Sequence, residues 1–275
     1  MDSRTGKEIR LGRILRPATK RSVTVAFSHG VLLGPQKGFL TYSQMDQMLQ
    51  IFQAADAVML SPGMINQLSS HFTGRNRPGL ILQGDWQNVG RARQGDFPKT
   101  GLSTAMLTAE QALASGADAI MTYLWMGGDD PELEAQEVAR NSAFARACES
   151  SGLPLLIESR GLGQENDSDG NPNLELLKFH TRVAAELGAD FIKTKYSGSV
   201  ETFKEVTSQC PVPILVAGGS RLETMDEALK LVEDVIAGGG AGVVFGRNIF
   251  QFDKPSLMLN NILERVHGKG DPKSS

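Results

Sequence analysis

The sequence predicts an α/β fold of the (β/α)8 type, a single-domain TIM barrel, and three observations lead to this prediction. The chain has 275 residues, close to the roughly 250 that are typical of one such barrel. Eight short apolar segments each precede a helix or a plausible helical segment. No linker rich in proline, serine or charge divides them. We therefore expect one domain over residues 1–275, with an N-terminal extension at 1–21 and a flexible tail at 269–275.

A repeated junction between helix and strand favours a parallel sheet. A glycine or another small residue stands directly before an apolar strand in four places, at residues 54–58, 115–120, 187–192 and 239–244. A helix C-terminus often needs the left-handed conformation, which glycine adopts without strain. A junction that recurs in this way indicates consecutive βα units, and therefore parallel strands.

Strands are expected where short runs of β-branched and apolar residues lie between breakers. The first run, Ser22-Val-Thr-Val-Ala-Phe27, ends at Ser28-His29-Gly30, and the third ends at Gly84-Asp85. The eight runs are 22–27, 54–60, 78–82, 119–125, 155–157, 191–195, 212–217 and 242–245.

Helices are expected between these runs, where apolar residues recur at helical spacing. In 41–53 the apolar positions follow the cap candidate Thr41, and 108–115 shows a capping-box pattern from Ser103 or Thr108 to Gln111. The remaining helices are predicted at 131–150, 174–187, 199–208, 223–237 and 255–267.

Three segments lack regular periodicity. Residues 1–19 are basic and irregular and are expected to lie against one end of the barrel. Residues 86–101 read as a loop that carries Arg91, Arg93 and Lys99. Residues 161–173 contain three acidic side chains but lack the ligand set and closing glutamate of a calcium loop, so we interpret them as solvated.

Composition excludes several classes of function. The formal net charge of −3 gives no electrostatic reason to expect nucleic acid as a partner. No apolar run reaches the ~18 residues of a membrane span, and residues 1–21 are too polar for a signal peptide. Cys148 and Cys210 form no metal-binding pattern, which favours two buried thiols in a reducing compartment, the cytoplasm.

Two lysines in the sixth predicted strand are candidates for chemistry. Lys193 and Lys195 are two residues apart, so their side chains should share one face. A lysine in an apolar setting beside a second cation loses proton affinity and becomes a candidate Schiff-base nucleophile. The alternative is that both lysines cap the strand and reach water.

Glycines at the ends of the last two strands predict a phosphate site. Gly218, Gly219 and Ser220 follow the seventh strand, and Gly246 and Arg247 follow the eighth. The loops after these two strands commonly bind phosphate in TIM barrels through backbone N–H groups. Arg247 can add a bidentate ion pair, whereas the alternative is that the glycines only form tight turns.

Three motifs together resemble a known enzyme family. They are Gly188-Ala-Asp190 with Ile192-Lys-Thr194, Cys210-Pro-Val-Pro-Ile-Leu-Val-Ala-Gly-Gly219, and Gly246-Arg-Asn-Ile-Phe-Gln251. The chain resembles the class I aldolases of the DeoC and archaeal fructose-bisphosphate aldolase group over residues 10–267, most specifically over 187–251. Its C-terminal half is most similar to the autoinducer-2-phosphate aldolase or thiolase branch, and it is more loosely similar to the aminodideoxyheptulosonate synthases. The resemblance implies that Lys193 forms the Schiff base, with Lys195 as a neighbour that lowers its pKa.

The chain departs from the family pattern at two strand ends. Ser28 stands where the family has the aspartate of Asp-His-Gly, and Glu158-Ser-Arg-Gly161 replaces Tyr-Pro-Arg-Gly. Glu158 can substitute as the acid/base if a half-buried position raises its pKa, or it can form an ion pair with Arg160 or a barrel lysine. Tyr123 is a second candidate donor or a wall residue, and His29 either contacts substrate or braces its loop.

These observations predict a class I aldolase that acts on a phosphorylated ketose or related keto-phosphate without a metal or cofactor. Two alternatives stay open, thiolase-like acyl transfer on a phosphorylated diketone, and a catalytically altered homologue that only binds sugar phosphate. The resemblance also implies a homo-oligomer.

Overall fold

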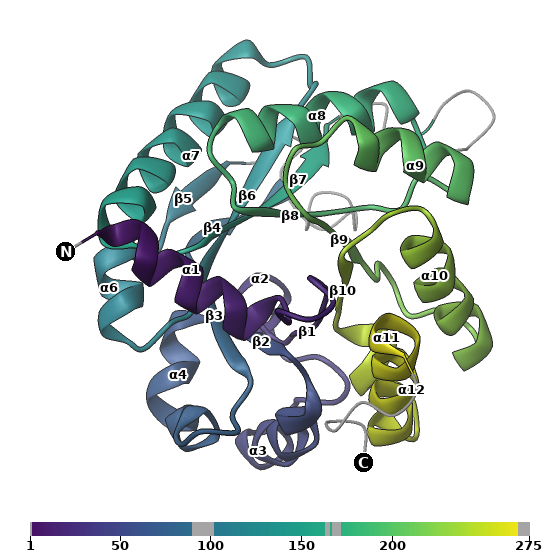
Figure 1. The fold of residues 1–275 in the computed structure, drawn as a ribbon. Helices are drawn as coiled ribbons and strands as arrows, with labels where there is room; N and C mark the ends of the chain where they lie inside the picture. The colour runs from purple at the N-terminus through teal and green to yellow at the C-terminus, as the bar shows by residue number, and fades with distance from the viewer. Residues whose placement is uncertain (1, 90–101, 163–165, 167–171, 269–275) are drawn as a thin grey trace.

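Eight parallel strands form a closed barrel surrounded by helices (Figure 1). The computed structural model describes residues 2–89, 102–162, 166 and 172–268. The barrel strands are β1 (Ser22–Ala26), β2 (Ala57–Leu60), β3 (Gly79–Gln83), β6 (Ala119–Met126), β7 (Leu155–Gly161), β8 (Phe191–Thr194), β9 (Ile214–Ala217) and β10 (Gly242–Phe245). Each pairs with the next in chain order, and β1 pairs with β10 to close the ring. The predicted TIM barrel is confirmed.

The helices lie mostly where helical spacing predicts them. They are α1 (Ser3–Ile14), α2 (Gly30–Leu33), α3 (Tyr42–Ile51), α4 (Pro62–Leu68), α6 (Ala109–Ala114), α7 (Pro131–Ser151), α8 (Leu174–Glu186), α9 (Val200–Ser208), α10 (Met225–Ala237), α11 (Arg247–Phe250) and α12 (Pro255–His267), with 3-10 turns η1 (Phe52–Ala54) and η2 (Ser69–Phe72). Thr41 caps α3, and Thr108 forms the predicted capping box with Gln111 at the start of α6.

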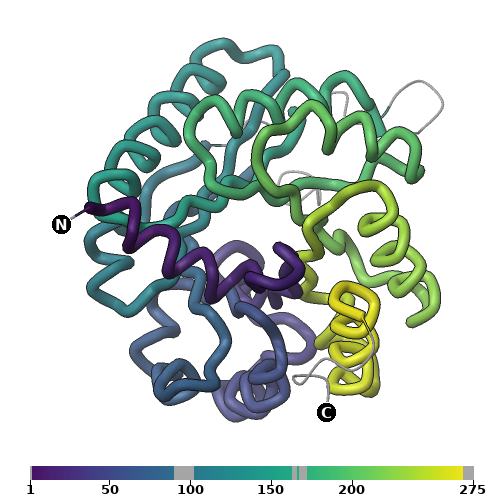
Figure 2. Tube along the Cα trace, in the orientation of Figure 1, coloured from purple at the N-terminus to yellow at the C-terminus, as the bar shows by residue number. Residues whose placement is uncertain are grey.

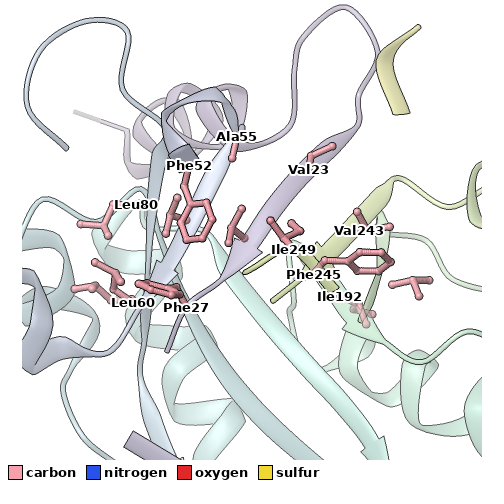
Figure 3. Packing of buried hydrophobic residues seen from close by; sticks show 14 of the residues in the cluster. Val23, Phe27, Phe52, Ala55, Leu60, Leu80, Ile192, Val243, Phe245 and Ile249 are labelled. Atoms are coloured by element: carbon pink, nitrogen blue, oxygen red, sulfur yellow. The ribbon is translucent and has the colours of Figure 1, made fainter. Parts of the chain in front are cut away.

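Apolar side chains along the strands alternate between two layers. Ile192 belongs to the larger cluster, which packs between strands and helices (Figure 3). Its neighbour Phe191 belongs to a second cluster that includes residues such as Met59 and Leu156 and fills the barrel interior. Because successive strand residues point to opposite faces, Lys193 faces the interior as Phe191 does.

The aspartates of the repeated junctions have a structural role. Asp56, Asp118 and Asp190 each accept a hydrogen bond from a backbone N–H near the start of the preceding barrel strand. The donors are Val23 at 2.7 Å, Leu80 at 3.0 Å and Leu155 at 2.8 Å. Each junction therefore holds together the N-terminal ends of two neighbouring strands.

The N-terminal extension closes this same end of the barrel. Figure 2 shows α1, in purple, crossing the ring of strands, and Ile14 is fully buried in the interior cluster. Lys7 lies 3.2 Å from Asp190, Arg13 lies 2.8 Å from Asp118, and Arg16 lies 2.5 Å from Asp56. The prediction that residues 1–19 are irregular is therefore wrong. Tertiary ion pairs support a helix whose local sequence is a weak signal.

A β-hairpin is inserted after β3. β4 (Asp85–Gln87) pairs antiparallel with β5 (Ser103–Ala105), so the prediction of a loop from residue 86 is wrong at Trp86 and Gln87. Arg91, Arg93 and Lys99 lie outside the described residues, as do the acidic residues Glu165, Asp167 and Asp169 and the tail at 269–275.

The described residues include neither a membrane-spanning helix nor a metal-binding cluster. None of the helices that the structure describes is both long and apolar enough to span a membrane. Within the same part of the chain, no three His, Cys, Asp or Glu side chains are grouped so that they could hold a metal ion.

Candidate active site

A cavity of about 460 Å³ opens at the C-terminal ends of the barrel strands. All but one of the predicted site residues line it, from six segments of the chain: His29, Tyr123, Glu158, Lys193, Lys195, Gly218, Gly219, Ser220, Gly246 and Arg247. Ser28 is the exception, because it is buried and does not line the cavity. The barrel thus brings together residues that lie up to 218 positions apart, from His29 to Arg247.

Three polar side chains form a row across neighbouring strands. Tyr123 of β6 is in register with Glu158 of β7, and Glu158 is in register with Lys193 of β8. All three are buried, with 7%, 3% and 7% of their surface exposed, and all three line the cavity. Adjacent strands lie about 4.8 Å apart, so Glu158 stands between the phenol and the amine.

Glu158 is held by two cations. Its Oε2 accepts a hydrogen bond from Lys193 Nζ at 2.6 Å, and its Oε1 accepts one from Arg160 at 2.6 Å. Arg160 also lines the cavity. Sequence reasoning considered Arg160 only as an ion-pair partner. Its position two residues after Glu158 on a strand, and thus on the same face, was the available signal.

Of the two alternatives left open for Glu158, the structure supports the ion pair with Arg160 and a barrel lysine and not a raised pKa. Burial alone would raise the pKa of this carboxyl, but the charges of Lys193 and Arg160 outweigh burial and lower it to about 2. Glu158 is therefore a carboxylate at neutral pH. It is suited to act as a counter-ion rather than as a proton donor.

The pKa of Lys193 is lowered. Burial is the main cause, and the charges of Arg160 and Arg247 act in the same direction, while Glu158 opposes them. The cations that lower the pKa of Lys193 are thus Arg160 and Arg247. The predicted role of Lys195, to lower this pKa as a neighbouring cation, stays a prediction. Lys195 lies just beyond β8 on the cavity wall and is exposed. A buried amine of lowered pKa beside an open cavity is what Schiff-base chemistry requires.

His29 is a neutral imidazole at physiological pH. Burial lowers its pKa to about 3, with smaller contributions from the charges of Lys193 and Arg247. The ring packs edge-on against Phe250 with centroids 5.8 Å apart, and its Nδ1 is buried with no hydrogen-bond partner among the described residues. His29 can therefore brace the loop and also offer a polar atom to a ligand.

Tyr123 remains protonated. Burial raises its pKa well above 10, and the negative charges of Glu158 and Asp85 add to this effect. Its ring stacks on Trp125 with centroids 6.2 Å apart. The Gln87 side chain acts weakly in the opposite direction on this pKa, and Gln87 is a cavity residue that sequence reasoning missed because it was placed in a loop.

The loop after β9, with Gly218 and Gly219, and the loop after β10, with Gly246, approach each other closely. A Cβ at Gly246 would lie 2.5 Å from the Ala26 carbonyl oxygen and from the His29 ring, so only glycine fits there. Asn248 is fully buried and ties the loops together, since its Nδ2 donates to the Gly218 carbonyl at 2.6 Å and its Oδ1 accepts from Leu222 N–H at 2.8 Å. This arrangement exposes Gly219 and Ser220 at the cavity rim.

Arg247 is the cation of this part of the cavity. Its Nε is buried without a hydrogen-bond partner among the described residues. Burial and the nearby charge of Arg160 lower its pKa. Two guanidinium groups that face one cavity, one of them with a buried N–H that has no partner among the described residues, favour an anionic ligand.

Comparison with known proteins gives consistent matches. Residues 22–252 match the profile of the DeoC/LacD family aldolase. An uncharacterised aldolase of Saccharolobus solfataricus is 30% identical over 267 residues, 97% of this chain and 96% of that protein. A 3-hydroxy-5-phosphonooxypentane-2,4-dione thiolase of Klebsiella pneumoniae is 32% identical, over 95% of this chain and 81% of that protein. The crystal structure of an archaeal fructose 1,6-bisphosphate aldolase has a TM-score of 0.80 and 25% identity, covering 96% of this chain and 99% of that one.

Proposed function

Because the chain belongs to the DeoC/LacD aldolase family, we propose that it is a class I aldolase whose Lys193 forms a Schiff base with a phosphorylated ketose or related keto-phosphate. One observation carries this proposal. Lys193 is a buried amine of lowered pKa, it lines the cavity, and it lies in a row with a carboxylate and a phenol.

Lys193 would act as the nucleophile. Its neutral amine adds to the ketone carbon, and loss of one water from the carbinolamine gives a protonated imine. In cleavage, the proton is removed from the hydroxyl on the second carbon from the imine carbon, and the bond between that carbon and the carbon next to the imine breaks. The bonding electrons move to the imine nitrogen, which releases an aldehyde and leaves an enamine. Protonation of the enamine carbon and addition of water then free the ketone and Lys193.

Glu158 would stabilise the charge of the imine, and Tyr123 would donate the proton to the enamine. The Glu158 carboxylate lies 2.6 Å from Lys193 Nζ, so it can stabilise the positive charge of the protonated imine. Tyr123 keeps its proton at neutral pH and is the candidate donor to the enamine carbon. The phenolate so formed can regain a proton from the substrate hydroxyl in the next turnover.

The substrate phosphate would bind across the cavity from Tyr123. Gly218, Gly219, Ser220 and Gly246 offer backbone N–H groups at the cavity wall, and Arg247 offers charge. Binding energy from a phosphate remote from the reacting carbon would position that carbon over Lys193.

Acyl transfer is the second candidate. The Klebsiella thiolase is similar over 95% of this chain, and Ser28 and Glu158 occupy the positions where the family pattern has an aspartate and a tyrosine. A thiolase-like reaction would keep the lysine and the phosphate site but transfer an acyl group from a phosphorylated diketone. The third candidate, suggested by the same two positions, is a protein that binds a sugar phosphate without turning it over.

Borohydride trapping tests the proposal. The protein is incubated with dihydroxyacetone phosphate or fructose 1,6-bisphosphate, reduced, and analysed by peptide mass spectrometry. We expect a covalent adduct on Lys193 that is absent in Lys193→Arg. The control Lys204→Arg changes an exposed lysine of α9 and should keep the adduct. Binding of these compounds by calorimetry without any adduct would refute imine chemistry and favour the binding protein.

We also propose a cytoplasmic homo-oligomer. Cys148 and Cys210 are both free thiols, which suits a reducing compartment. Large apolar side chains such as Leu40 and Tyr42 are more than half exposed and could form part of a subunit contact. Light scattering of the purified protein would test the assembly, and a monomer at micromolar concentration would refute it.

A further inference from the structure

We propose that Arg140 is a positioning residue that holds Tyr123 and Trp125 in place on the cavity wall for reaction with the bound substrate. This inference rests on the proposed function, in which Tyr123 donates a proton to the enamine formed on Lys193. Arg140 lies on α7, on the outer side of the strand β6 that carries both aromatic side chains (Figure 1), and it does not line the cavity itself.

The strand β6 extends beyond the end of its neighbour β3. Pairing between the two strands ends at Gln83↔Met121, and the Gly84 N–H then donates to the Met121 carbonyl at 2.6 Å. The chain continues into β4, which pairs with β5, whereas β6 continues along the barrel. The backbone groups of Tyr123 and Trp125 on this side of β6 therefore need other partners, because an unpaired buried N–H or C=O is costly.

Side chains supply these partners. The Asp85 side chain accepts the Tyr123 N–H, with its two oxygens 3.1 Å and 3.0 Å from the nitrogen. The Tyr123 carbonyl accepts a hydrogen bond from Arg140 Nη2 at 2.6 Å, and Glu137 Oε2 accepts the Trp125 N–H at 3.0 Å. Asp85 and Glu137 are both fully buried. This cluster of side chains thus takes the place of a strand beside the last part of β6.

Arg140 connects all of these contacts. Its Nε donates to Asp85 at 3.0 Å. Its two terminal nitrogens donate to the Glu137 carboxylate at 2.5 Å and 2.7 Å. One guanidinium therefore orients both acceptors of the backbone N–H groups and also contacts the Tyr123 carbonyl directly. Asn141 adds a second donor to that carbonyl, at 2.9 Å.

A guanidinium is suited to this position. It is planar and carries five N–H donors in a fixed fork, whereas a lysine ammonium is a compact charge without that geometry. The Arg140 side chain is 10% exposed. Burial acts to lower its pKa, but Glu137 and Asp85 outweigh burial and raise it. Arg140 therefore stays a cation at physiological pH.

The contacts of Arg140 bear on the reacting groups. The Tyr123 and Trp125 rings are stacked with centroids 6.2 Å apart, so a shift of this part of β6 moves both. Tyr123 is in register with Glu158, which lies 2.6 Å from Lys193 Nζ. A misplacement of about 1 Å can slow a reaction by about a hundredfold. Loosening β6 should therefore slow proton transfer more than it affects imine formation.

A spectroscopic measurement tests positioning without turnover. Arg140→Lys keeps the positive charge between the two buried acids but loses the fork. The chain has three tyrosines, so protein labelled with 3-fluorotyrosine should give three ¹⁹F resonances, and Tyr123→Phe identifies one. Arg140→Lys should shift or broaden that resonance and leave the other two unchanged. The matched control Arg146→Lys changes an exposed arginine of the same helix and should leave all three unchanged.

Two results would overturn the proposal. One is a Tyr123 resonance that is unchanged in Arg140→Lys, and the other is an equal change in all three resonances, which would indicate general loosening of the fold. If Arg140→Lys does not fold, the double variant Glu137→Gln with Arg140→Gln replaces it. That variant removes one charge of each sign from the cluster, and the same expectations apply to it.

A kinetic measurement tests the consequence. Exchange of the carbon-bound protons of dihydroxyacetone phosphate with D2O reports proton transfer between imine and enamine, and borohydride trapping reports imine formation. At saturation, Arg140→Lys should slow exchange by about tenfold or more, with KM and the trapped adduct within about twofold of wild type. Arg146→Lys should match wild type. An equal fall in exchange and in adduct would contradict a role through Tyr123.

Combination with Tyr123→Phe shows whether Arg140 acts through the phenol. If it does, adding Arg140→Lys to Tyr123→Phe should slow exchange no further, whereas additive losses would overturn the proposal. If wild type gives neither adduct nor exchange, the proposed function fails, while the ¹⁹F measurement still decides whether Arg140 positions Tyr123.

Discussion

Replacing Glu158 by glutamine tests the ion pairs at the base of the cavity, because glutamine has nearly the shape of a protonated glutamate. Glu158 is 3% exposed and contacts Lys193 and Arg160 at 2.6 Å each. Its pKa is about 2 in the folded protein against an ordinary value of 4.5. At about 1.4 kcal/mol for each pH unit, this interval corresponds to about 3 kcal/mol of folding stability carried by the ionised carboxylate.

The sign of the pH dependence follows from the direction of the shift. A carboxyl whose pKa is lowered by folding stabilises the protein fully above its unfolded pKa. That stability is lost as the pH falls from about 4.5 through about 2. Glu158→Gln should therefore cost about 3 kcal/mol at pH 7, and the difference from wild type should shrink below pH 4.5.

Thermal unfolding at several pH values measures this difference. For a chain of this size, 3 kcal/mol corresponds to a Tm lower by about 6–12 °C. Glu186→Gln is the control, since Glu186 forms an exposed pair with Arg182, which is worth about 0.5 kcal/mol or less. A Tm difference that is equally large at pH 7 and pH 3.5, or no larger than that of the control, would refute the ion-pair account.

Three further predictions follow from the geometry. The ¹H NMR signals of the His29 ring should not titrate between pH 5 and 8, because its pKa is about 3; a midpoint near 6.5 would contradict the buried, neutral imidazole. Gly246→Ala should weaken phosphate binding, measured by calorimetry, by about tenfold or more, because its Cβ would lie 2.5 Å from the Ala26 oxygen. Gly63→Ala, whose Cβ meets nothing within 4 Å, should bind phosphate like wild type. Arg16→Ala should destabilise the chain in urea by about 3 kcal/mol, whereas Arg4→Ala, which removes an exposed pair, should change stability by less than about 1 kcal/mol; equal effects would argue against the buried pair with Asp56.

Local patterns were sufficient for the barrel and for the family. The repeated junction around Asp56, Asp118 and Asp190 predicts parallel βα units, and the closed barrel confirms it. The motifs between residues 187 and 251 indicate the aldolase family, which the match over residues 22–252 confirms. Both signals depend on residues that are close together in the sequence, so one sequence is enough to read them.

Features that depend on distant partners could not be predicted. The pKa of Glu158 is lowered by Lys193 from the next strand and by the Arg160 side chain, and a strand-end position alone left both a raised pKa and an ion pair open. Gln87 was missed because β4 and β5 are separated by residues 88–102, and no short turn motif marks the hairpin. The helix α1 was missed because its ion pairs lie on three separate junctions.

These ion pairs also have a kinetic consequence. Arg16 and Asp56 are 40 positions apart in the chain, and Arg13 and Asp118 are 105 apart. Contacts that close such long loops carry a large entropic cost before they form, so α1 should dock after the strands it bridges. Weakening it, as in Arg13→Ala, should then accelerate unfolding while leaving the refolding rate nearly unchanged. The N-terminal helix would thus set how long the native barrel persists rather than how fast it is reached.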